Sequence, residues 1–185
     1  MLAKREIRAN FDYFLEQKAK RLEHLAKYMA RFSIALRLER DALPALDGWL
    51  YRYGGHLIPG GGEAVSALAD YEPAWDGAFR GLNIVNDIST FAGDYVVSRN
   101  PNVRWDVWYG DGSKYDYEEK GFGQPCLFGL PCSGYESHHS MLWEIFSCCN
   151  AGYWRLIQGG SPIGIWGKPG DLLRRLDHLM SQSDR

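Results

Sequence analysis

Hydrophobic side chains recur at helical spacing along residues 81–99, GLNIVNDISTFAGDYVVSR. This periodicity predicts a buried helix around which the rest of the chain packs. Asn100 and Pro101 end it, because proline disfavours helical geometry in the preceding residue. We predict that Asp87 and Asp94, on the polar side, face solvent or cap amides of a neighbouring element. The alternative is a paired-carboxylate site for a cation or for acid–base chemistry.

Helices are also predicted at both ends of the chain. Residues 4–31 carry an apolar stripe between Lys, Arg and Glu, which indicates one long helix, or two helices broken near Gln17. Residues 42–53 form a further helix, for which Asp41 is the expected cap. From Gly170 onward, regularly spaced leucines predict a closing amphipathic helix.

A small antiparallel sheet is predicted after the central helix. Apolar and polar residues alternate over 103–109, which is strand periodicity. A returning strand around 115–117 and a third strand over 124–128 would complete a meander. The fold class is therefore α+β, with N-terminal helices and a central buried helix packed on this sheet and a helix closing the C-terminal end.

Four shorter elements complete the prediction. Residues 63–69 and 140–149 are expected to form short helices. Residues 153–157 and 163–166 are apolar enough for additional strands. The segment 71–79 is expected to be a loop pinned by a single tryptophan.

Length and composition favour a single domain. The chain has 185 residues and 14% aromatic residues, enough for one core filled by large rings. Its parts are a basic helical segment (1–40), a helical core (41–101) and a sheet with the C-terminal helix (102–185). Neither a secretory signal nor a membrane-spanning stretch is recognisable, so we predict a cytoplasmic protein that does not bind membranes.

Charge is divided unevenly along the chain. Residues 1–40 carry a net charge of +5 and the remainder −7. A basic first helix can bind nucleic acid, but Glu16 and Glu23 interleave with its bases, so a solvated outer face is the preferred interpretation. The glycine run at 60–62 lacks the Lys-Ser/Thr of a phosphate-binding loop. We therefore predict no nucleic-acid partner and no bound cofactor.

Thiols and imidazoles gather between residues 126 and 149. They are Cys126, Cys132, His138, His139, Cys148 and Cys149. Their spacing does not match that of structural zinc sites, so we predict buried reduced cysteines, exposed loop histidines and no metal. The alternative function is a hydrolase or metal-dependent enzyme that uses this region.

Several stretches together resemble a class of small bacterial proteins of the toxin-immunity or accessory type. They are LDGWL at 46–50, Trp75 with Gly77, the run 81–101 and VRWDV at 103–107. The resemblance implies a protein encoded beside a secreted toxin, and it carries no catalytic residues.

Two details of the resemblance concern packing. Gly93 and Asp94 stand near the end of the central helix, and Trp105 stands in the following strand. Gly93 would let a neighbouring element approach closely, and Trp105 would fill the core beneath it.

We expect a non-catalytic binding protein that neutralises a basic toxin through an acidic surface. The expected partner-binding residues are Asp106, Trp108, Asp111, Tyr115, Asp116, Glu118 and Glu119. If the aromatic residues among them are exposed, a homodimer is the alternative use of this surface.

Overall fold

The structure, a computed structural model, describes residues 4–57, 83–110, 122–130, 138–159 and 167–181. Within these ranges the chain forms five α-helices and a two-stranded antiparallel sheet, which confirms the α+β prediction. The elements are α1 (Lys4–Ala30), α2 (Leu43–Tyr53), α4 (Asn83–Arg99), β1 (Arg104–Val107), β2 (Pro125–Phe128), α5 (Met141–Gln158) and α6 (Asp171–Ser181), with 3₁₀ turns η1 (Arg40–Ala42) and η2 (Gly54–Leu57).

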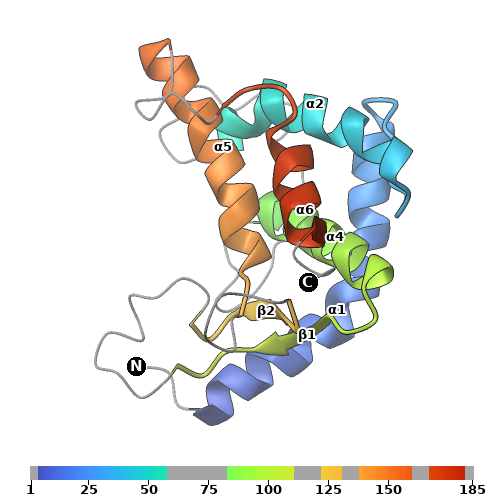
Figure 1. Ribbon diagram of the computed structural model, residues 1–185, viewed down its shortest axis with the longest axis vertical. Coiled ribbons are helices and arrows are strands. Elements are labelled where there is room, and N and C mark those ends of the chain that lie inside the picture. The colour runs from blue at the N-terminus through green and yellow to red at the C-terminus, as the bar shows by residue number, and fades with distance from the viewer. Residues whose placement is uncertain (1–3, 58–82, 111–121, 131–137, 160–166, 182–185) are drawn as a thin grey trace.

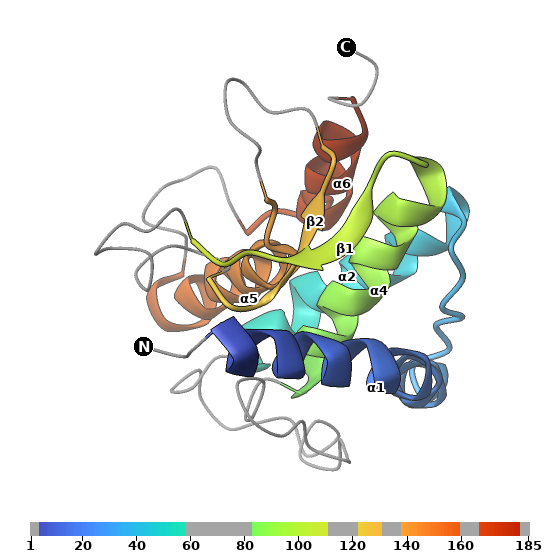
Figure 2. The same cartoon turned by 90° about the horizontal axis from the view of Figure 1, so that it is seen from below.

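The helices form a frame around α4. In Figure 1, α1 and α5 lie on opposite sides, α2 spans one end between them, and the sheet lies at the other end. α4 and α6 lie inside this frame, and α4 contacts α1, α5, α6 and β1. Figure 2 shows the sheet from below, with α1 running along one side of the molecule. This arrangement buries α4 on nearly all sides.

Burial of α4 confirms the predicted central helix. Ile88, Ala92 and Val96 are completely covered, and they pack in one core with residues of α1, α2, α5 and α6. α1 is a single unbroken helix, so the prediction of one long helix is correct and the alternative break near Gln17 is wrong. Its first half packs a smaller cluster against β1, in which Phe11 and Val107 are buried. The long first helix therefore spans both apolar clusters.

Gly54 and Gly55 follow the predicted end of α2, but the chain continues as η2 rather than as a loop. The backbone of η2 lies directly against the backbone of α5. A Cβ atom placed on Gly55 would come within 2.5 Å of the carbonyl carbon of Gly152. Only glycine at both positions permits this contact.

Two predictions about helix ends and strands in this region are wrong. Residues 153–157 are the last turns of α5 rather than a strand, because Gly152 packs against η2 instead of breaking the helix. The helix ends only at Gly159, whose φ of 71° is the left-handed conformation common at helix ends. Asp41 does not cap α2; it belongs to η1 and accepts a hydrogen bond from Arg37.

The sheet also differs from the predicted meander. β1 pairs directly with β2, in a register that runs from Arg104 opposite Phe128 to Val107 opposite Pro125. In a meander, the first and third strands would be parallel and separated by the returning strand, so the predicted strand order is wrong. The predicted elements at 63–69, 71–79, 115–117 and 163–166 lie outside the described residues.

The predicted closing helix is confirmed as α6, and its N-terminus is held by α2. The buried carboxylate of Asp47 accepts hydrogen bonds from the backbone N–H groups of Gly170, at 2.7 Å, and Leu172, at 2.9 Å. The first N–H groups of a helix have no partner within the helix, so a carboxylate placed there stabilises it. Among the described helices, none combines the length and apolar content required to span a bilayer.

Candidate functional site

The contact between α4 and β1 confirms the predicted roles of Gly93 and Trp105. A Cβ atom on Gly93 would overlap the six-membered ring of Trp105, so the glycine lets the strand lie directly on the helix. The indole Nε1 of Trp105 donates to the carboxylate of Asp94 at 2.8 Å. Lys18 of α1 donates to the same carboxylate at 2.7 Å. Asp94 therefore joins three elements, and the prediction that it faces solvent or caps backbone amides is wrong.

Asp87 lies still deeper. Its side chain is fully buried and is held by the guanidinium of Arg21 in α1, with Nε at 3.0 Å and Nη2 at 2.5 Å from the two carboxylate oxygens. The solvent-facing prediction fails for Asp87, and the solvated outer face predicted for α1 fails for Lys18 and Arg21. The physical reason is that these bases lie on the side of α1 that packs against α4. The two carboxylates thus fasten one helix to another.

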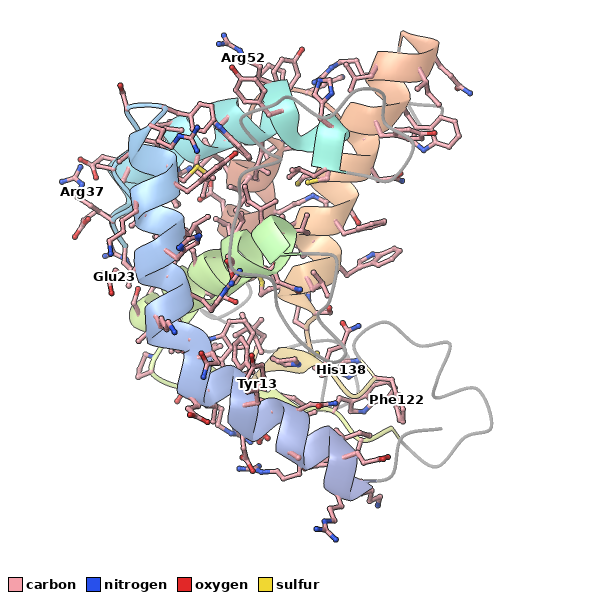
Figure 3. All side chains as sticks on the ribbon, turned by 180° about the vertical axis from the view of Figure 1, so that it is seen from behind. Tyr13, Glu23, Arg37, Arg52, Phe122 and His138 are labelled. Carbon is pink, nitrogen blue, oxygen red and sulfur yellow. The ribbon has the colours of Figure 1, made fainter. Side chains whose placement is uncertain are left out.

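The predicted partner-binding surface begins where β1 ends. There the ring of Trp108 stacks on the imidazole of His138, with centroids 3.9 Å apart and planes 10° apart. Phe122 meets Trp108 edge-on at 6.1 Å, and its neighbour Gly123 donates a backbone hydrogen bond to the Trp108 carbonyl. Figure 3 shows Phe122 and His138 at the same end of the sheet. We call Trp108, Phe122 and His138 the Trp108 cluster; all three are half-buried.

Asp106 lies two residues before the Trp108 cluster and is partly exposed. One of its carboxylate oxygens accepts the backbone N–H of Val107, and the other lies 3.7 Å from Arg104. Its charge is thus partly balanced within the strand. Asp106 lies in the last half of β1, and Trp108 follows directly after the strand. The other predicted partner-binding residues, Asp111, Tyr115, Asp116, Glu118 and Glu119, lie outside the described residues.

A separate polar cluster links α5 to α6 beside the sheet. Glu144 lies 3.2 Å from the imidazole of His139 and forms an ion pair with Arg175. Burial alone would raise the pKa of Glu144, but the close approach of the His139 imidazole and the charge of Arg175 outweigh it, so the pKa lies below its ordinary value. His139 also exchanges two backbone hydrogen bonds with Leu127 of β2, and both His138 and His139 are half-buried, so the prediction of exposed histidines is wrong. This cluster therefore fastens the sheet to two helices.

The thiols are in environments that keep them protonated. Burial raises the pKa of Cys126 in β2 to about 12, and that of Cys148 in α5 to about 12. Cys149 is completely buried against Gly54, and burial raises its pKa as well. A thiol, unlike a thiolate, is a poor nucleophile and a poor metal ligand. Cys126 and Cys149 are buried as predicted, whereas Cys148 is partly exposed; Cys132 lies outside the described residues.

We expect the described thiols to react slowly with iodoacetamide in the folded protein. At pH 8 a thiol of pKa about 12 is ionised roughly a thousandfold less than an ordinary cysteine, so its alkylation should slow in proportion. Peptide mass mapping after timed quenching measures each cysteine separately. The chain unfolded in urea is the control, in which all sites should react quickly. Rapid labelling of Cys148 in the folded protein would instead support the nucleophile of the alternative enzymatic function.

The site as a whole belongs to a helical α+β protein whose charged side chains largely fasten its elements to one another. No group of three or more His, Cys, Asp or Glu side chains within the described ranges is arranged to hold a metal ion. Comparisons of the chain with protein-family models, curated proteins and solved structures found no match. The Trp108 cluster and the acidic sequence that follows it form the candidate binding surface.

Proposed function

We propose that this protein is a non-catalytic binding protein that holds a protein partner against the end of the sheet, around the Trp108 cluster. The observation that carries the proposal is the partly exposed stack of Trp108 on His138, directly before the acidic segment 111–119. Tryptophan is enriched among the residues that contribute most to protein interfaces, because it combines a large apolar area with few rotatable bonds.

The composition of the adjoining segment suggests the charge of the partner. Residues 106–119 contain five acidic residues and a single lysine. Such a surface attracts basic proteins and accelerates their association. We propose that the partner is a basic toxin and that the protein acts as its immunity factor in the bacterial cytoplasm. The sequence resemblance to immunity-type proteins supports this step.

The test is association with the product of the gene beside this one. If that product is a toxin, co-expression of this protein should restore growth of cells that produce it. The substitutions Asp111→Lys, Asp116→Lys and Glu118→Lys together should slow association at low salt by about tenfold or more, because electrostatic attraction becomes repulsion. Biosensor kinetics at several salt concentrations would measure the effect.

A matched control uses three exposed carboxylates on other elements. The substitutions Glu16→Lys, Glu23→Lys and Asp177→Lys on α1 and α6 make the same change in net charge outside the acidic segment 106–119. Their effect on association should be small. Equal slowing by both triple variants would assign the effect to net charge and contradict this surface. Lack of binding by the neighbouring gene product would contradict the immunity role.

A further inference from the structure

A cavity of about 360 Å³ lies at the corner where α1 turns into α2. Its wall includes Phe32, Gly48, Trp49, Arg52 and Tyr53. Figure 1 shows α2 at the end of the molecule opposite the sheet, so this corner cavity is separate from the Trp108 cluster. Its volume lies within the range of small-molecule sites.

Aromatic rings form one wall of the corner cavity. The ring centroids of Phe32, Trp49 and Tyr53 lie 5.5 to 5.6 Å from one another, in tilted or edge-on pairs. Rings locked together in this way form a rigid apolar surface. A flat aromatic ligand could stack or pack edge-on against such a wall.

Trp49 supplies a polar group that nothing in the described chain satisfies. Its side chain is only 4% exposed, and no described residue accepts a hydrogen bond from its indole N–H. A buried indole N–H ordinarily finds an acceptor, because leaving it unpaired is unfavourable. The indole nitrogen itself is covered by protein atoms, so a ligand in the cavity meets other atoms of the Trp49 ring, and the N–H serves as a nearby reporter of binding.

Gly48 lies on the wall of the same cavity and has open space beside it. It lies in the interior of α2, where glycine weakens a helix, and it is exposed. A Cβ atom there would meet no described atom within 4 Å, so packing does not require the glycine. This differs from Gly55 and Gly93, which neighbouring atoms crowd closely. The cavity therefore has room for a small side chain at this position, whereas a large one would fill it.

Arg52 places a positive charge at the rim of the corner cavity. Figure 3 shows its side chain projecting from α2 away from the body of the protein. Its guanidinium carbon lies 6.0 Å from the Tyr53 ring centre, and no carboxylate of the described chain pairs with it. An anionic substituent therefore suits this rim.

We propose that the corner cavity binds a planar aromatic carboxylate from solution. The ring system packs on the wall of Phe32, Trp49 and Tyr53, beside Gly48. The carboxylate lies toward Arg52. This activity goes beyond partner binding at the sheet end, and neither depends on the other.

The probe is 2-naphthoate, with the neutral 2-naphthamide as its isostere. Binding is followed through the indole N–H resonance of Trp49, assigned with the variant Trp49→Phe. We expect 2-naphthoate to shift this resonance saturably and to bind about three- to fivefold more tightly than 2-naphthamide, as one exposed charge pair predicts. Arg52→Gln should remove that preference. Arg52 is exposed, so this variant leaves the core unchanged.

Gly48 provides the steric test. Gly48→Leu should fill the cavity and abolish the shift, whereas Gly48→Ala, the matched control, should retain binding. Both replacements favour the helix, so both variants should fold. The proposal is overturned by the absence of a saturable shift, by equal shifts in Gly48→Leu and Gly48→Ala, or by uniform shifts of all seven tryptophans.

Discussion

Replacing Asp87 with alanine is expected to reduce the free energy of unfolding by about 3–5 kcal/mol, a large fraction of the stability of an ordinary domain. The change leaves the Arg21 guanidinium, 4% exposed, without the carboxylate that now binds it through two hydrogen bonds. The cost is high because a buried charge keeps its desolvation penalty after its partner is removed. Urea denaturation, with the slope compared between variants, measures the loss.

Two controls separate the lost ion pair from general damage. The double variant Arg21→Met with Asp87→Leu should recover most of the stability, since apolar side chains often replace a buried pair without loss. Glu23→Ala breaks the exposed pair with Lys27 on the same helix and should cost less than about 0.5 kcal/mol. A double variant as unstable as Asp87→Ala alone would show that the ion pair is not the source of the effect.

The second large effect is expected at the contact between η2 and α5. Gly55→Ala should destabilise the protein by about 2–3 kcal/mol, because overpacking forces neighbouring structure to move. The new methyl group would lie 2.5 to 2.7 Å from backbone atoms of Gly152 and Tyr153, which cannot rotate away. The two elements must therefore separate. Thermal or urea unfolding measures the change.

Gly48→Ala is the matched control for this substitution. It makes the same chemical change in a helix, but its methyl group meets no described atom within 4 Å. We expect it to be neutral or stabilising by up to about 1 kcal/mol. Similar losses at both glycines would mean that backbone entropy, rather than the close approach of η2 to α5, governs these positions.

Local signals in the sequence were sufficient for the helices and for one tertiary contact. The apolar residues of α4 and the leucines of α6 repeat from one helical turn to the next. This spacing is local in the sequence, so it predicts both helices directly. Gly93 and Trp105 were also interpreted correctly, because a small residue in a helix near a large one in the next strand has a simple steric meaning. α5 extends beyond the helix predicted over 140–149, since Gly152 is accommodated within it by the contact with Gly55, which the sequence does not show.

The buried ion pair escaped prediction although the sequence carries a trace of it. Arg21 follows Phe14 by seven residues and precedes Leu25 by four, so it lies on the apolar stripe of α1. Asp87 likewise lies between Ile84 and Phe91 on the buried side of α4. A charged residue on each of two apolar stripes is a signal for a buried pair. The sequence does not reveal that α1 and α4 pack together, because Arg21 and Asp87 are separated by 66 positions along the chain.

The hydrogen bonds from the start of α6 to the carboxylate of Asp47 affect how the chain folds during its synthesis. Asp47 precedes the amides that it binds by 123 and 125 residues, so a ribosome must synthesise most of the protein before this helix can dock. Until then, the apolar surface that receives Leu172, Leu176 and Leu179 has no cover. Contacts so distant in sequence form late, and nascent chains with such surfaces aggregate readily. Efficient production of this protein should therefore depend on chaperones that bind the growing polypeptide.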